Sequence, residues 1–378
     1  MNNFQKIQIG GVEYYIIDSI QNFRAEDSFI QPKNKLKRYT SKRGEARKHI
    51  GSYNADSGKK ISHFFEYNTW GKEHGEVKIK GKRKTINSAK ESGAVVSDEQ
   101  CFFSKSNFLK YLHDAKIEYF KQEQEYHNNI ASFYDKRLEK VSKLSDEIIY
   151  FSIYDSSDNL SQKQNRGYIR SDDSIWKLWR ELILPSISYL SILKLKLVND
   201  KESKPFFYFR ILLDYQFRSI VHPKLTIPTT QIVEEKEKQT TYKRTSRKGA
   251  SKYRDDVIHH MPECPFTEID EKKLLIASHI KPYQVCINED REDQAIDYFN
   301  GLSLSPTYDK LFDQGYITFT DKGELLCGTQ LSAYTWEKLN INPNAKNKMR
   351  IYPEDREEYL DYHRKFVFQD NVEDIMLD

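Results

Sequence analysis

The sequence predicts an α+β protein of two parts, a larger mixed α/β N-terminal region over residues 1–235 and a smaller C-terminal domain over residues 236–378. The chain has 378 residues, which is enough for two or three hydrophobic cores. Strand-like and helix-like apolar periodicities both occur along it. A polar stretch rich in Thr, Lys and Arg, from Ile227 to Ser251, is typical of a linker between the two parts.

The N-terminal region is expected to begin with strands. Apolar residues alternate with other residues between Ile7 and Ile16, and Gly10-Gly11 indicates a turn within this stretch.

A helical stretch is expected next, because residues 94–166 contain neither Gly nor Pro. Apolar residues recur there at spacings of three or four, namely Ile130, Tyr134, Leu138, Val141 and Leu144. We therefore expect one long amphipathic helix over about residues 104–145, or a helical hairpin. Its apolar stripe could pack against its own chain, the more common fate of such a face, or form a dimer interface.

Further strands are expected after Trp176 and Trp179. Pro185 should interrupt a helix, and strands should follow around residues 193–197 and 206–213. We expect a second core to begin here.

The composition excludes several classes of protein. Four scattered cysteines without a CxxC pair form neither a disulfide framework nor a zinc ribbon, which favours a reducing cytoplasm. No signal-like N-terminus and no apolar run of roughly 20 residues is present, so neither secretion nor membrane insertion is expected.

The net charge of +4 is small, but the basic residues are clustered. Three clusters lie at residues 33–48, 78–84 and 236–254. Each cluster alone could be solvated surface, whereas three together favour neutralisation of DNA phosphates. The candidate DNA-binding residues are Lys37, Arg38, Lys42, Arg43, Arg244, Arg247 and Lys248.

The C-terminal domain carries the chemistry. An apolar strand from Leu274 to Ile280 should hold His279 at its end, before Lys281-Pro282. Asn300-Gly301 indicates a tight turn, followed by a short strand at residues 302–304.

A helix should follow, with Ser305 as N-cap and Pro306 in its first turn. This helix places Asp309 and Asp313 on one face. A strand-borne histidine, an Asn-Gly pair and an aspartate pair are each common in purely structural roles. In this order, two carboxylates near a histidine form a candidate hard-cation site with a candidate base beside it.

These segments resemble the HNH endonuclease family, in particular its restriction-endonuclease branch. The matching motifs are ASHIKPY, FNGLSLSPTYDKLFDQGYITF, the upstream YRDDVIHHMPECPFTEI and the C-terminal YLDYHRKFVF, so the resemblance covers about residues 250–370. It implies a ββα-metal nuclease fold roughly between Cys264 and Gly323, attached to an N-terminal region that recognises DNA.

The resemblance also implies roles for single residues. His279 matches the general base, and Asn300 matches the central Asn that holds the loop and orients the histidine. Asp309 takes the place of the final His as a metal ligand, and Asp313 lies where several members carry a second ligand. Carboxylate ligands favour Mg²⁺, with Mn²⁺ as an alternative, over zinc.

Two departures from the family pattern affect the site. Ser278 stands before the histidine, where many members carry an acidic or histidine metal ligand, so water, phosphate oxygens or another acid would complete the ligand set. Cys264 has no partner at zinc-knuckle spacing and is expected to be a buried small residue, so structural zinc is not expected. His363 is expected to brace packing in preference to a catalytic role.

The resemblance implies a metal-dependent endonuclease that cuts double-stranded DNA, with a sequence-specific type II restriction enzyme as the preferred form. Cleavage of both strands favours a homodimer, and restriction requires a cognate DNA methyltransferase. A modification-dependent or phage-defence nuclease would share the same catalytic residues. A non-catalytic DNA-binding protein with a degenerate HNH fold would keep the basic clusters and lose metal dependence.

Overall fold

The computed structural model describes residues 4–25, 29–30, 45–50, 64–65, 78–79, 82–83, 97–121, 126, 129–153, 155–159, 166–171, 173–185, 187–200, 202–214, 217–218, 249–345 and 354–375. The chain divides into two compact units, one of residues 9–214 and one of residues 1–8 together with 215–378. The predicted boundary near residue 235 lies outside the described residues.

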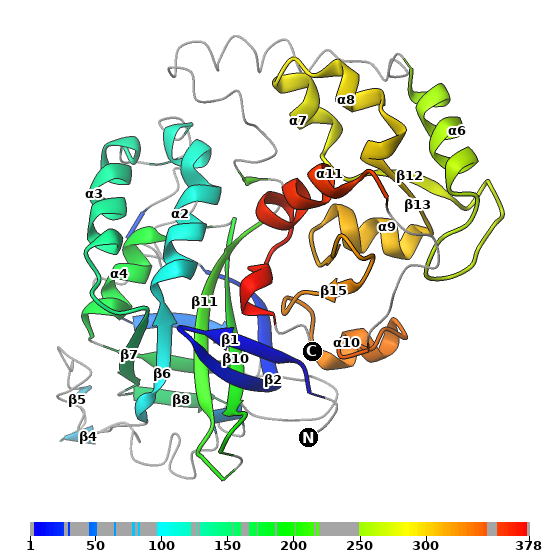
Figure 1. Cartoon of the computed structure of the whole chain (residues 1–378). Coiled ribbons are helices and arrows are strands. Elements are labelled where there is room, and N and C mark those ends of the chain that lie inside the picture. Colours follow the sequence, from blue (N-terminus) through cyan, green and yellow to red (C-terminus); the bar gives the residue numbers. More distant parts are fainter. Residues whose placement is uncertain are drawn as a thin grey trace. The chain divides into compact units, whose positions relative to one another are not determined.

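A six-stranded sheet has the order β1-β2-β10-β11-β6-β7, and all of its strands except β1 lie entirely within the unit of residues 9–214 (Figure 1). Its strands are β1 (Lys6–Ile9), β2 (Val12–Arg24), β6 (Ser97–Ser104), β7 (Ile148–Ile153), β10 (Ser188–Leu197) and β11 (Phe206–Leu213). The predicted N-terminal strands are confirmed, and Gly10 and Gly11 form their turn with positive φ angles of 56° and 79°. Glycine adopts these angles without the penalty that a Cβ brings.

The two strands predicted at residues 193–197 and 206–213 are confirmed as β10 and β11, but the expected second core is wrong. β10 pairs with β2 on one side and with β11 on the other, so both strands lie at the centre of the same sheet as the N-terminal strands. The pairing joins segments that lie far apart in sequence (Leu197 with Tyr14, for example), which a local pattern does not reveal.

Residues 104–145 contain two helices, so the helical hairpin that was one of the two expectations is confirmed and the single long helix is wrong. The two helices are α2 (Lys105–Phe120) and α3 (Ala131–Ser142), which pack side by side (Figure 1). Ile130, Tyr134 and Val141 of the apolar stripe are buried in the chain. The stripe therefore packs against its own chain and is not available as the dimer interface.

Aromatic residues fill the core between this sheet and helix α4 (Ser174–Leu182). Trp176 and Trp179 of α4 lie with ring centroids 6.4 and 6.2 Å from that of Phe103. Such rings bury large apolar areas and dominate the stability of a core. As predicted, α4 ends before Pro185.

Smaller elements complete this unit. A three-stranded sheet has the order β3-β9-β8, and β4 pairs with β5. The strands are β3 (Glu45–Ile50), β4 (Lys78–Ile79), β5 (Lys82–Arg83), β8 (Asp155–Asn159) and β9 (Arg166–Arg170).

The C-terminal unit is built around two antiparallel strand pairs, β12-β13 and β14-β15. Its strands are β12 (Ile276–His279), β13 (Gly301–Leu304), β14 (Ile317–Phe319) and β15 (Leu325–Cys327). Its helices are α6 (Ala250–His260), α7 (Tyr283–Asn288), α8 (Glu292–Ile296), η5 (Tyr298–Asn300), α9 (Pro306–Asp313), α10 (Ala333–Lys338), α11 (Glu357–Tyr362), η6 (His363–Val367) and η7 (Val372–Asp374). Helices and sheets occur in both units, so the predicted α+β class is confirmed.

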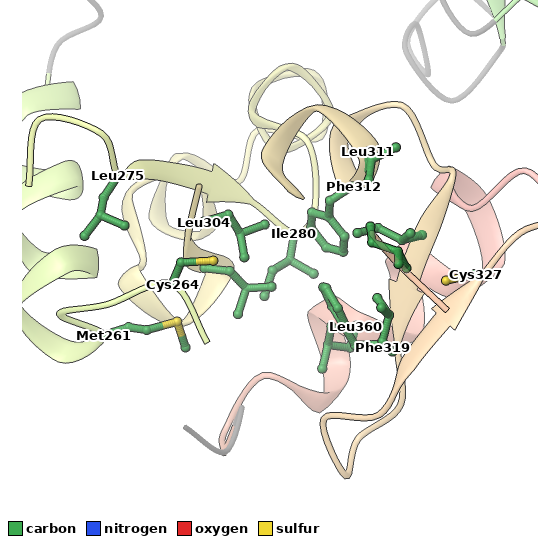
Figure 2. Packing of buried hydrophobic residues seen from close by; sticks show 14 of the residues in the cluster. Met261, Cys264, Leu275, Ile280, Leu304, Leu311, Phe312, Phe319, Cys327 and Leu360 are labelled. Carbon is green, nitrogen blue, oxygen red and sulfur yellow. The ribbon is translucent and has the colours of Figure 1, made fainter. Parts of the chain in front are cut away.

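One hydrophobic cluster holds this unit together (Figure 2). Ile280 after β12, Leu304 of β13, Phe312 of α9 and Phe319 of β14 are all fully buried in it. Burial of each such side chain stabilises the fold by about 1.5–3 kcal/mol. The cluster therefore fixes β12, β13 and α9 relative to one another, and these are the elements that carry the candidate site.

The four cysteines, Cys101, Cys264, Cys286 and Cys327, are all buried as free thiols. Among the described residues, none of the helices has the length and the apolar content needed to traverse a bilayer.

Candidate active site

The β12-β13 pair positions His279. β12 ends at His279, as predicted, although it begins at Ile276 and not at Leu274. The antiparallel register sets His279 opposite Gly301. Pro282 follows three residues later and ends the strand-like backbone before helix α7. The imidazole is therefore held at the end of a paired strand.

One ring nitrogen of His279 has a backbone partner. Nε2 lies 3.0 Å from the carbonyl oxygen of Ala295, and only a protonated Nε2 can donate to this acceptor. The neutral ring then carries no proton on Nδ1, which is the basic nitrogen. The side chain is half-buried, so the imidazole is accessible from one side.

Asn300 is completely buried and acts as a clamp on the loop that follows β12. Its Oδ1 accepts from the Lys281 N–H at 2.7 Å, and its Nδ2 donates to the carbonyl oxygens of Lys281 and Gln294, each at 3.0 Å. Gln294 directly precedes Ala295, the partner of His279. Asn300 can therefore support His279 indirectly, through the backbone of Gln294 and Ala295.

The expected tight turn at Asn300-Gly301 is wrong. Asn300 ends the 3₁₀ helix η5, and Gly301 opens β13 in the extended conformation with φ of −142°. A Cβ at position 301 would lie 2.5 Å from Cγ2 of Val257 and 2.6 Å from the hydroxyl oxygen of Tyr253. Glycine is required here by the close approach of helix α6, and not by a turn.

Helix α9 starts as predicted, with Ser305 in the N-cap conformation and Pro306 in the first turn. Asp309 is half-buried and Asp313, one turn later, is exposed. The Ser278 hydroxyl lies close enough to Asp309 to lower the pKa of its carboxyl. Burial raises the pKa of Asp309, the nearby charge of Asp313 raises it further, and the Ser278 hydrogen bond opposes this change.

His279 and Asp309 lie on opposite sides of the end of β12, because Asp309 is beside Ser278, the neighbour of His279. Consecutive strand residues point to opposite faces, so Ser278 faces α9 while His279 faces α6. The candidate base and the candidate cation ligands flank the end of β12.

The candidate cation site offers oxygen atoms alone. They belong to the carboxylates of Asp309 and Asp313 and to the hydroxyl of Ser278. Within the described part of the chain, no cluster of three or more His, Cys, Asp or Glu side chains is arranged to hold a metal. Two carboxylates nevertheless fit Mg²⁺, which keeps several waters and borrows phosphate oxygens from its substrate. The like-charge effect of Asp313 on Asp309 is what a bound cation relieves.

Cys264 is fully buried, as expected for a small packing residue. Burial by itself raises the pKa of its thiol, but hydrogen bonds from Thr267 and from the backbone N–H groups of Phe266, Ser305 and Thr267 lower it. His363 is also buried, between Thr318 at 3.0 Å and the Phe312 carbonyl at 3.1 Å, so it braces α9 against β14.

Two residues near His279 were not singled out from the sequence. Tyr253 of α6 stacks on the imidazole, and its place at the start of the YRDDVIHH segment is the signal that could have found it. Lys281 is buried, and its ammonium group donates to Glu289 at 2.6 Å and to Gln294 at 2.9 Å. Tyr253 thus contacts the His279 ring itself, and Lys281 links the loop after β12 to α7 and α8.

The candidate DNA-binding residues lie outside the described residues. They are Lys37, Arg38, Lys42, Arg43, Arg244, Arg247 and Lys248. Their roles remain predictions.

Comparison with known proteins gives one family. A search of curated proteins finds no match. The model of the HNH endonuclease family matches residues 264–320, which include the whole of β12, β13 and α9. The segment that contains His279, Asn300 and Asp309 thus matches the HNH endonuclease family.

Proposed function

We propose that this protein is a metal-dependent endonuclease that hydrolyses phosphodiester bonds of double-stranded DNA. The observation that carries the proposal is the end of β12, where a backbone carbonyl orients the His279 ring and the adjacent Ser278 lies beside Asp309. A base and an acidic cation site on neighbouring residues are the two parts that phosphodiester hydrolysis requires.

His279 is the general base of the proposed reaction. Its Nδ1 takes a proton from a water molecule, and the water oxygen attacks the scissile phosphorus. The bond from phosphorus to the 3′ oxygen breaks and this oxygen takes a proton from solvent water, which leaves a 5′ phosphate and a 3′ hydroxyl. The hydrogen bond from Nε2 to Ala295 holds the ring in the tautomer that this transfer needs.

Asp309 and Asp313 are the proposed ligands of Mg²⁺, with Mn²⁺ as a substitute. When bound, the cation supplies positive charge beside the scissile phosphate and the leaving oxygen. Ser278 orients the Asp309 carboxylate through its hydroxyl. Asn300 acts indirectly by fixing the loop that presents the Ala295 carbonyl.

We further propose that the enzyme is a sequence-specific type II restriction endonuclease. A small nuclease module contacts mainly the DNA backbone, so base recognition requires added protein surface. The unit of residues 9–214 offers that surface, and the basic cluster at residues 33–48 belongs to it. Such an enzyme acts with a cognate DNA methyltransferase that protects the host genome.

A homodimer is proposed because each strand of the duplex needs an active site. The α3 stripe is buried within its own chain, so the contact between the two copies lies on another surface.

Digestion of plasmid DNA tests the proposed function. Purified protein is incubated with methylated and unmethylated plasmid, with Mg²⁺ or with EDTA, beside His279→Ala. We expect Mg²⁺-dependent cleavage of unmethylated plasmid, and a rate about 100- to 10,000-fold lower for His279→Ala with DNA binding retained, as removal of a general base gives. Cleavage of methylated plasmid alone indicates a modification-dependent nuclease, and binding without cleavage indicates a degenerate HNH fold.

A further inference from the structure

Tyr253 lies directly against the proposed general base. It belongs to helix α6, is 5% exposed, and stacks on His279 with ring centroids 4.2 Å apart and an interplanar angle of 17°. Tyr283 approaches the same imidazole edge-on, at 5.8 Å and 76°. The histidine therefore has an aromatic surface under one face.

The hydroxyl of Tyr253 anchors this surface to the strand pair. It donates to the Asn300 carbonyl oxygen at 3.0 Å, and the same oxygen accepts the N–H of Ile280 at 3.1 Å. Ile280 directly follows His279, and Asn300 directly precedes Gly301, the pairing partner of His279. A movement of the Tyr253 ring would break a buried hydrogen bond, which costs about 1–3 kcal/mol.

The strand opposite His279 is shaped to admit the Tyr253 ring. Position 301 is glycine, and a Cβ there would lie 2.6 Å from the Tyr253 hydroxyl oxygen. The hydroxyl that makes the hydrogen bond to Asn300 is therefore also the atom that leaves no room for a side chain at position 301.

We infer that Tyr253 is a positioning residue for His279, an inference that rests on the proposed function. The torsion that rotates an imidazole about its Cβ–Cγ bond is broad, so the ring does not hold one plane by itself. The stacked tyrosine fixes the plane of the ring, and the Ala295 carbonyl fixes which nitrogen points inward. Together they aim Nδ1 in one direction. Tyr253 touches no substrate in this arrangement because it is buried beneath the histidine.

A positioning role predicts a loss of turnover without a loss of binding. Tyr253→Leu removes both the stacking ring and the hydroxyl, so kcat should fall by about 100-fold, as a small misplacement of a reacting group does. The KM for DNA and the DNA affinity should stay unchanged. Tyr253→Phe keeps the ring and should retain most of the kcat that Tyr253→Leu loses.

His260→Ala is the matched control. His260 also lies on α6, about two helical turns after Tyr253, and forms the same kind of stack, with Tyr298 at 3.9 Å and 11°, but it is exposed. This variant removes a Tyr–His stack from the same helix and should keep the wild-type kcat.

A spectroscopic readout separates this inference from the proposed function. The Cε1 proton resonance of His279, assigned by its loss in His279→Ala, is shifted by the ring current of the stacked tyrosine. It should move in Tyr253→Leu and stay in Tyr253→Phe and His260→Ala. If the wild type fails to cleave DNA, the proposed function fails, and this resonance still decides whether Tyr253 holds the ring.

Three results would overturn the inference. The first is a His279 resonance that does not respond to Tyr253→Leu. The second is an equal loss of kcat in the Phe and Leu variants, which would show that the ring face contributes nothing. The third is a kcat that stays at the wild-type value while the resonance moves.

Discussion

Two aspartates on α9 differ in their surroundings although they share one helical face. Asp309 is half-buried beside the Ser278 hydroxyl, whereas Asp313 is exposed beside Gln314. A half-buried carboxylate is already desolvated and oriented, so it gains more from a cation than an exposed carboxylate does. Their contributions to metal binding should therefore be unequal.

Asp309→Asn should weaken Mg²⁺ binding more than Asp313→Asn. We expect a loss of at least about tenfold for Asp309→Asn, since even residues behind the metal ligands contribute about 10- to 100-fold to affinity. Calorimetric titration with Mn²⁺ or Mg²⁺ in the presence of bound DNA measures this, and Glu324→Gln, a change outside the candidate site, is the control. Wild-type metal affinity and cleavage in Asp309→Asn would place the cation elsewhere.

His363 makes a prediction about stability and pH. The pKa of His363 is lowered to about 3, chiefly by burial and also by the charges of Arg218 and Arg364, while the bond to the Phe312 carbonyl acts in the opposite direction. The unfolded chain, with an ordinary histidine pKa of about 6.5, binds more protons than the native state between these two values. Stability due to His363 is therefore present above the unfolded value and falls as the pH falls toward the folded value.

Urea unfolding at several pH values measures this effect. The free energy of unfolding should decrease by up to about 1.4 kcal/mol per pH unit on going down from pH 6.5 on account of this residue. His363→Gln should show a flatter slope there and should cost about 1–3 kcal/mol at neutral pH, because Thr318 and Phe312 lose part of their hydrogen bonding. An unchanged slope in His363→Gln would contradict the explanation.

At the scale of elements, helix α6 packs closely on strand β13, and the cost of a larger side chain at position 301 measures how tight this packing is. Gly301→Ala places a Cβ against Val257 and Tyr253, both buried, and overpacking of this kind costs about 1–3 kcal/mol. Thermal or urea unfolding should show this loss. Val257→Ala in the same chain removes one of the two close approaches and should restore part of the stability. Full stability of Gly301→Ala would mean that α6 does not approach β13 as described.

Short local patterns explain why some elements were predictable. His279 at a strand end, the Ser305 N-cap and Pro306 are signals contained within a few residues, and the structure has them where expected. The role of Gly301 was not predictable in this way, because its requirement comes from Tyr253 and Val257 of α6, much earlier in the chain. Asn-Gly is a common turn pair, and nothing local distinguishes a turn from a close approach of two elements.

At the scale of the whole molecule, the sequence predicted the α+β class and the HNH-family segment but not how strands far apart in the chain pair. Of the two expectations for residues 104–145, the structure has the helical hairpin, formed by α2 and α3, and not the single long helix, although no Gly or Pro breaks the stretch. The expected second core is instead the centre of one sheet, because β10 pairs with β2. Both outcomes depend on tertiary packing, which overrides local propensity.

The basic cluster before α6 predicts how the DNA affinity of the whole protein depends on salt. Arg244, Arg247 and Lys248, changed together to Ala, should weaken binding to all DNA sequences alike. The slope of log affinity against log salt should become shallower by about 0.9 for each DNA phosphate that the variant no longer neutralises. Fluorescence anisotropy with specific and non-specific duplexes at several salt concentrations measures both effects. An identical salt slope would make the cluster ordinary solvated surface.

Because all four cysteines are buried, the native chain should react little with thiol reagents. A maleimide dye should react slowly with it, so a cysteine introduced at an exposed site can be labelled selectively. Lys136 in one unit and Lys322 in the other are exposed. A donor and an acceptor dye at these two positions would report by energy transfer, in single molecules, whether the two units change their separation when the protein engages DNA.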